Sequence, residues 1–132
     1  MARMIQALVI DGDRLNRVLL RDILEHEGLQ VLDASGQQLG LQILRAAPCD
    51  LVITDYAADD EAEAMKLGEL MRDLPETRFI ALSPAQGFGH PVASLPEEER
   101  TNVRTLIKPV FRQELLRAIQ ELFPDWRPRD EG

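Results

Sequence analysis

LVIDGDRLNR, residues 8–17, passes from an apolar strand into a helix within a few residues. The run that ends here, ALVI at 7–10, is short and continuously apolar, which is typical of a strand buried on both faces. Asp13 can cap the helix that follows, and Gly28 stands where a left-handed residue would end it. The helical period places these apolar residues on one side: Leu15, Val18, Leu19, Ile23 and Leu24. The stretch therefore predicts a strand and a helix joined by an acidic turn.

The same alternation of strand and helix continues along the chain. Apolar runs of strand length are LQVLDA (29–34), DLVITD (50–55), RFIALS (78–83) and TLIK (105–108). Segments of helical period separate them, one of them starting at about Glu61, and RQELLRAIQELF (112–123) closes the pattern as an amphipathic helix. Because right-handed crossovers restrict the topology, we expect an α/β fold, a flavodoxin-like doubly wound parallel sheet of five strands in the order 2-1-3-4-5.

One segment departs from this pattern where the fourth helix is expected. Residues 84–102 contain three prolines and two glycines and show little apolar periodicity. We therefore expect a long loop with at most a short helix in place of most of the fourth helix. The chain of 132 residues is long enough for one domain, which we place at 1–123, with 124–132 as a tail or the start of a linker.

Composition narrows the classes of function. The net charge of −8 argues against direct binding of nucleic acid, which needs concentrated Lys and Arg. The single cysteine, Cys49, excludes an internal disulfide and fits a reducing compartment. Because the sequence contains no apolar run of membrane-spanning length, we expect a cytoplasmic protein that does not bind a membrane.

Polar residues follow the apolar strands at their carboxyl ends, where ligands bind in open parallel sheets. They are Asp11, Asp55, Ser83 and Lys108. This set suits the transfer of a phosphoryl group to a carboxylate, with Asp55 as the acceptor. Asp11 would help to hold Mg²⁺, and Lys108 and Ser83 would contact phosphoryl oxygens.

The sequence resembles the receiver domain of bacterial two-component response regulators over about residues 5–123. The resemblance rests on LVIDGDRLNRVLLRDILEHEGLQVLDA, DLVITD, RFIALS and LIKPVFRQELLRAI. It implies a phosphoacceptor signalling domain, not an enzyme, which receives its phosphoryl group on Asp55 from a histidine kinase or a phosphotransfer protein. It also implies a downstream protein target, allows a homodimer, and makes the Lys108–Pro109 peptide bond cis.

The resemblance further implies a magnesium site on Asp11, Asp55 and the backbone carbonyl of Ala57. This chain departs from the pattern there, because receivers carry a second acid where Gly12 stands and that acid usually binds the metal directly. Asp13 is one residue further on, and we expect its side chain to point into the helix cap, although it stays a candidate ligand. We therefore expect weak or absent binding of Mg²⁺.

Other departures lie around the same site. Thr105 occupies the position of an aromatic switch residue, which would act together with the switch hydroxyl of Ser83. The loop after Asp55 offers Asp59 or Asp60 as carboxylates that could restore the charge lost at Gly12. Two interpretations stay open within this class: an atypical receiver that is still phosphorylated, and a pseudo-receiver that acts as a protein-interaction module without phosphorylation.

A reading from a different class is a phosphatase similar to the haloacid dehalogenases. Asp11 and Asp13 would be its D-x-D pair, the first as nucleophile and the second as general acid. Those enzymes need a further acidic pair after the lysine, and here only Glu114, Glu121 and tail acids follow Lys108. We therefore place this alternative well behind the receiver.

Overall fold

The computed structural model describes residues 4–55, 68–83 and 101–129, and all structural statements below refer to them. The strands are β1 (Gln6–Ile10), β2 (Gln30–Ala34), β3 (Leu51–Asp55), β4 (Arg78–Ser83) and β5 (Val103–Ile107). The helices are α1 (Arg14–His26), α2 (Gln37–Ala46) and α5 (Arg112–Leu122), and residues 68–73 are also helical. The strands pair in parallel in the order β2-β1-β3-β4-β5, which confirms the predicted α/β sheet.

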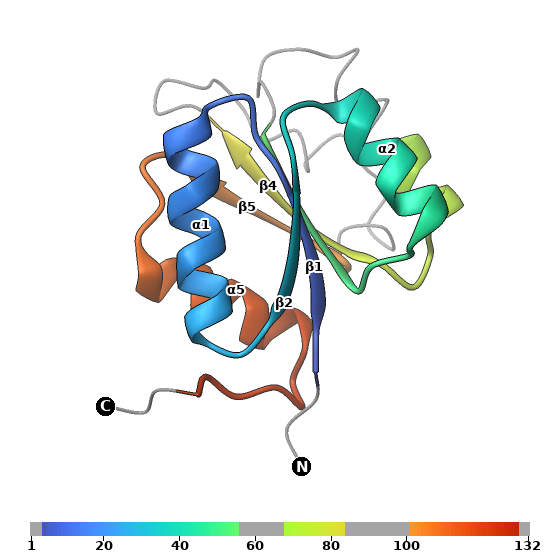
Figure 1. Cartoon of the computed structure of the whole chain (residues 1–132). Helices are drawn as coiled ribbons and strands as arrows, with labels where there is room; N and C mark the ends of the chain where they lie inside the picture. Colours follow the sequence, from blue (N-terminus) through green and yellow to red (C-terminus); the bar gives the residue numbers. More distant parts are fainter. Residues whose placement is uncertain (1–3, 56–67, 84–100, 130–132) are drawn as a thin grey trace.

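Helices cover both faces of the sheet, as continuous apolar strands require. In Figure 1, α1 and α5 lie on one side of the strands and α2 lies on the other. Alternate residues of each strand enter two separate cores. Ile53 and Ile80 belong to the core that includes residues of α1 and α5, while Val52 and Phe79 belong to the core that includes Leu44 of α2.

The register brings the carboxyl ends of the strands to one edge of the sheet. Ile10 of β1 lies beside Thr54 of β3, so that the next residues, Asp11 and Asp55, leave the sheet at nearly the same height. On the other side of β3, Ser83 ends β4 beside Ile107 of β5. The residues predicted to form a site therefore leave the sheet along the same edge.

Helix α1 is rotated differently from the sequence expectation. Of the five apolar residues predicted to share one side of this helix, Leu24 is buried and Ile23 packs against the core, whereas Leu15, Val18 and Leu19 are exposed, with 78%, 48% and 53% of their surface accessible. The buried row is Leu20 and Leu24, spaced one turn apart. Both rows have helical spacing, so the pattern alone does not choose between them.

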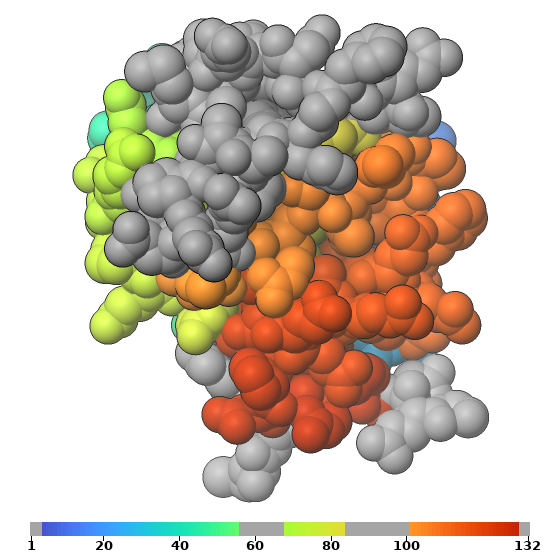
Figure 2. All heavy atoms as spheres, turned by 180° about the vertical axis from the view of Figure 1, so that it is seen from behind, coloured from blue at the N-terminus to red at the C-terminus, as the bar shows by residue number. Residues whose placement is uncertain are grey.

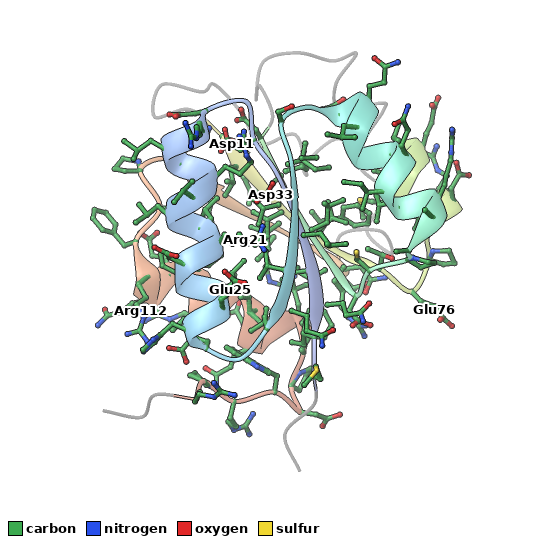
Figure 3. The ribbon with its side chains drawn as sticks, in the orientation of Figure 1. Asp11, Arg21, Glu25, Asp33, Glu76 and Arg112 are labelled. Carbon is green, nitrogen blue, oxygen red and sulfur yellow. The ribbon has the colours of Figure 1, made fainter. Side chains whose placement is uncertain are left out.

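Polar contacts between α1 and β2 accompany this rotation of α1. Arg21 donates to Asp33 of β2 at 2.8 Å and pairs with Glu25 one turn further along α1 at 3.2 Å (Figure 3). The Arg21–Asp33 pair joins α1 to β2, whereas the Arg21–Glu25 pair lies within α1. With α1 in this rotation, Leu20 and Leu24 pack onto the sheet. Gly28 has a φ of 90°, the left-handed conformation predicted for the residue that ends the helix.

The C-terminal segment packs against the domain beyond the end of α5. The predicted inward residues of this helix, Leu115, Leu116, Ile119 and Leu122, are all buried. Trp126 is 2% exposed and belongs to the same core, so the packed part of the chain extends past residue 123, where the sequence placed the end of the domain. Figure 2 shows β5, α5 and this segment, in orange and red, on the face opposite to the view of Figure 1. Most of the predicted loop at 84–102 lies outside the described residues.

Candidate functional site

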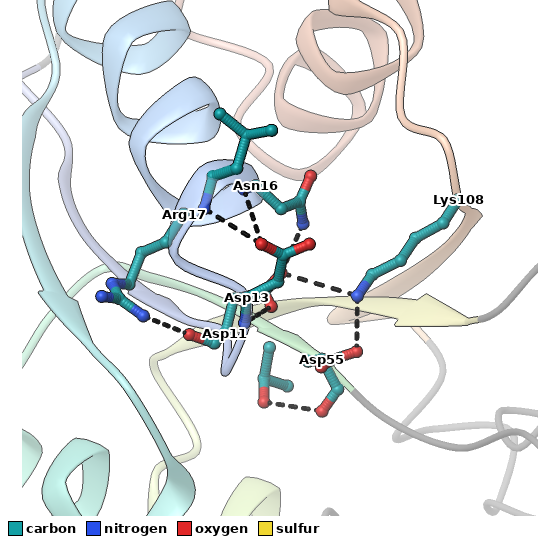
Figure 4. A network of polar contacts seen from close by, with 8 residues as sticks. Asp11, Asp13, Asn16, Arg17, Asp55 and Lys108 are labelled. Carbon is teal, nitrogen blue, oxygen red and sulfur yellow. Dashed lines mark hydrogen bonds and ion pairs between the residues drawn. The ribbon is translucent and has the colours of Figure 1, made fainter.

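The turn after β1 carries the first acid of the site. Asp11 is fully buried, and its Oδ1 accepts a hydrogen bond from the backbone N–H of Asp13 at 2.9 Å. The Asp13 carboxylate turns away from this pair, because its Oδ1 accepts from the N–H groups of Leu15 and Asn16 and caps α1. Asp13 therefore has the capping role that the sequence predicted. In Figure 4 dashed lines join the Asp13 carboxylate to the start of α1.

Two residues from the first turn of α1 hold Asp11 in place. The Asn16 Nδ2 donates to Asp11 Oδ2, and the Arg17 Nη1 donates to the backbone oxygen of Asp11 at 2.7 Å (Figure 4). The Arg17 Nε lies 3.9 Å from Asp33 Oδ1, which links this contact to the ion pairs of β2. The sequence reading missed Asn16 and Arg17. The available signal was their position on the first helical turn after a strand-end acid, where side chains point back toward the preceding strand.

Lys108 connects Asp11 with Asp55. Its Nζ lies 2.8 Å from Asp55 Oδ1 and 3.6 Å from Asp11 Oδ2 (Figure 4). The side chain of Asp55 is 41% exposed and that of Lys108 is 28% exposed, whereas Asp11 has no accessible side-chain surface. Of the two acids, Asp55 is the one that an incoming group can reach.

The environment of Lys108 favours its charged form. Burial alone would lower the pKa of this ammonium, but the hydrogen bond and charge of Asp55, together with the charge of Asp11, outweigh it and raise the pKa above its ordinary value. Lys108 therefore stays a cation at neutral pH, with two acceptors for its protons.

Two buried hydroxyls near β5 have no hydrogen-bond partner within the described part of the chain. They are Ser83 Oγ, on a residue that is 3% exposed, and Thr105 Oγ1. Ser83 lies beside Ile107 and Thr105 beside Ala81, which places the two hydroxyls on the same face of neighbouring strands. A buried hydroxyl without a partner costs free energy, so such a group is a candidate for contact with a ligand.

The other predicted site positions are placed only in part. The Lys108–Pro109 peptide bond is cis, the isomer that the resemblance implied. Ala57, Asp59 and Asp60 lie outside the described residues, so the structure does not place them relative to Asp55.

The described residues do not fit a magnesium ion well. Residues 4–55, 68–83 and 101–129 contain no group of three or more acids, histidines or cysteines able to hold a metal. Both oxygens of Asp11 already accept hydrogen bonds, and Gly12 adds no carboxylate. Mg²⁺ needs several oxygen ligands in near-octahedral geometry, so these residues alone are a poor site.

Comparison with known proteins identifies the fold. The sequence matches no protein-family model and has no significant match among curated proteins. Many solved structures are similar. A receiver domain from Clostridium thermocellum is 26% identical with a TM-score of 0.71 over 92% of this chain and 95% of that one. The signal receiver domain of an HD domain-containing protein from Pseudomonas fluorescens Pf-5 is 24% identical with a TM-score of 0.75, over 92% and 96%.

A third similar structure is a response regulator from Thermotoga maritima, 20% identical with a TM-score of 0.70 over 92% of this chain and 99% of that one. The parallel sheet and the acids at its carboxyl edge define a doubly wound α/β domain with a polar site at the strand ends. The chain has, more narrowly, the fold of response-regulator receiver domains.

The part of the chain that the structure describes contains no helix that is long and apolar enough to span a membrane.

Proposed function

We propose that this chain is a receiver domain whose Asp55 accepts a phosphoryl group from a histidine kinase or a phosphotransfer protein and passes the signal to a protein target. The observation that carries this proposal is the contact of Lys108 Nζ with Asp55 Oδ1 at 2.8 Å. It leaves a reachable carboxylate beside a fixed positive charge at the carboxyl edge of a parallel sheet, which is the arrangement that phosphoryl transfer to an acid needs.

The proposed step is a displacement at phosphorus. An oxygen of Asp55 forms a bond to phosphorus while the bond from phosphorus to the donor's imidazole nitrogen breaks. The electron pair leaves with that nitrogen, which takes a proton from solvent. Lys108 balances the charge on the phosphoryl oxygens, and the hydroxyl of Ser83, without a partner within the described residues, is available to donate to one of them.

A second candidate, the pseudo-receiver, is favoured by Gly12 and by the engaged oxygens of Asp11. In this version the fold is kept as a protein-interaction module and Asp55 is not phosphorylated. The phosphatase alternative fits the geometry less well. Its nucleophile would be the fully buried Asp11, and its general acid would be Asp13, which caps α1.

Incubation with acetyl phosphate in the presence of Mg²⁺, followed by intact mass spectrometry, tests the proposal. We expect the native protein to gain the mass of one phosphoryl group and Asp55→Asn to gain none. Asp50→Asn is the matched control, because Asp50 precedes the same strand at its opposite end and accepts from the Gln6 N–H. A native protein that gains no mass, although its circular dichroism shows it folded, favours the pseudo-receiver.

A further inference from the structure

One of the two negative charges at Asp11 and Asp55 is already balanced without a metal ion. Asp11 and Asp55 contribute two carboxylates, and Lys108 places one ammonium between them, 3.6 Å and 2.8 Å away. Asn16 adds a neutral donor to the buried acid. A pair of carboxylates that shares an ammonium attracts a divalent cation much less than three free carboxylates would.

Every polar atom of Asp11 also takes part in a hydrogen bond. Its backbone N–H donates to Ala34 O at 3.1 Å, and its backbone oxygen accepts from Arg17. Its carboxylate accepts from the Asp13 N–H and from Asn16 and faces Lys108. A metal ion could use an oxygen of Asp11 only by displacing one of these partners, all of which come from the chain itself.

From these contacts we propose that Lys108 is the resident cation of this site, occupying the place between Asp11 and Asp55 that a divalent ion would take, and that Asp11 is an anchor for Lys108 and not a metal ligand. It follows that the ground state does not bind Mg²⁺ and that phosphoryl transfer to Asp55 does not depend on it. The last statement rests on the proposed function.

Thermal unfolding with MgCl2, compared with NaCl at the same ionic strength, tests the first part. We expect the midpoint of the native protein to be the same in both salts. In Lys108→Met the place between Asp11 and Asp55 loses its ammonium and Asp55 loses its partner, so Mg²⁺ has one contact fewer to displace. It should then raise the midpoint by about 5 °C at a roughly ten-fold excess over its Kd. A saturable rise of the unfolding midpoint of the native protein with Mg²⁺ overturns the proposal. A Lys108→Met variant whose midpoint does not change with Mg²⁺ also overturns it.

Position 12 provides a matched pair of variants. A Cβ at Gly12 would meet only the Ser35 backbone oxygen, at 3.7 Å, so a side chain fits there. Gly12→Asp adds the absent carboxylate, and we expect it to gain a Mg²⁺-dependent rise in the midpoint. Gly12→Asn has the same size without the charge and should show none. If Gly12→Asp is as insensitive to Mg²⁺ as Gly12→Asn, there is no cation site between Asp11 and Asp55, and the proposal is overturned.

Phosphorylation by acetyl phosphate in Mg²⁺ and in EDTA separates this inference from the proposed function. We expect Asp55 to be modified to the same extent in both. Modification in Mg²⁺ alone contradicts the resident cation and leaves the phosphoacceptor role standing. If no modification occurs in either buffer while the unfolding midpoints behave as expected, the phosphoacceptor role fails and the resident cation stands.

Discussion

The amino and carboxyl ends of the strands differ in how their polar groups are paired. At the amino end, Thr77 donates its hydroxyl to the Cys49 backbone oxygen at 2.9 Å, and Asp50 accepts from the Gln6 N–H at 2.9 Å. The hydroxyl of Ser83, at the carboxyl end of β4, and that of Thr105, in the middle of β5, have no partner within the described residues. Both ends have buried polar groups, and among residues 4–55, 68–83 and 101–129 the buried hydroxyls without a partner lie on β4 and β5, away from the amino end.

The apolar packing differs in the same direction. The segment after α5 adds Trp126 and Phe123 to the core. The Cζ atom of Arg78, at the start of β4, lies over the Phe123 ring, 4.9 Å from its centroid. At the opposite end, Asp11, Asp55 and Lys108 put charges where apolar groups would stabilise more. The comparison teaches that the amino end supplies stability, while the carboxyl end gives up some of it to keep polar groups available.

Trp126→Ala should have the largest effect on stability. Removing an indole that is 2% exposed leaves a cavity in the core, so we expect the free energy of unfolding to fall by about 3–5 kcal/mol. Urea denaturation followed by circular dichroism measures it, because Trp126 is the only tryptophan and fluorescence would be lost. Leu15→Ala, at a side chain that is 78% exposed, is the control and should change stability by less than about 0.5 kcal/mol. Equal losses in the two variants would show that the segment after α5 adds nothing to the core.

The same substitution at two threonines should change stability in opposite directions. Thr77→Val removes a buried hydrogen bond and should cost about 1 kcal/mol. Thr105→Val replaces a buried hydroxyl without a partner by a methyl group of similar shape, and should raise the free energy of unfolding by up to about 1 kcal/mol. Chemical denaturation of both variants beside the native protein shows whether each substitution raises or lowers the free energy of unfolding. A loss in Thr105→Val as large as that in Thr77→Val would contradict the difference between the two ends.

Local rules predicted most of the fold from the sequence. The strand order followed from the alternation of strands and helices, and the cap at Asp13 and the left-handed Gly28 followed from residue chemistry at the ends of one helix. The meeting of Asp11, Asp55 and Lys108 followed from the rule that the carboxyl ends of parallel strands share an edge.

Features set by contacts between distant segments were not predictable in this way. The rotation of α1 is defined by its contacts with distant parts of the chain, such as the pairing of Arg21 with Asp33 of β2, so the equally spaced rows at Leu15 and Leu20 could not be told apart from periodicity. The contact of Asn16 with Asp11 is local, five residues along the chain, and its position on the first helical turn was a signal that the sequence analysis did not use. Trp126 lies in the segment predicted to be a tail or linker, and the sequence favoured a hydrophobic lid over the last helix for its side chain. Its place in the core beside that helix agrees with this interpretation.

The pH dependence of the stability difference between the native protein and Lys108 variants should be the smallest effect, and it reports on the carboxyl end. The pKa of Lys108 in the folded protein is raised above its ordinary value of 10.5 by Asp55 and Asp11, against the opposing effect of burial. Its contribution to stability is therefore fully present below pH 10.5 and is lost as the pH rises through the folded-state pKa. The difference in free energy of unfolding between the native protein and Lys108→Gln should be constant from neutral pH to about pH 10 and shrink above it. Lys108→Arg keeps its charge throughout this range, so it should gain stability relative to the native protein over the same interval. A difference between the native protein and Lys108→Gln that does not change with pH would mean that Lys108 gains nothing from the two acids on folding, and the carboxyl end would then hold its charges at no benefit to stability.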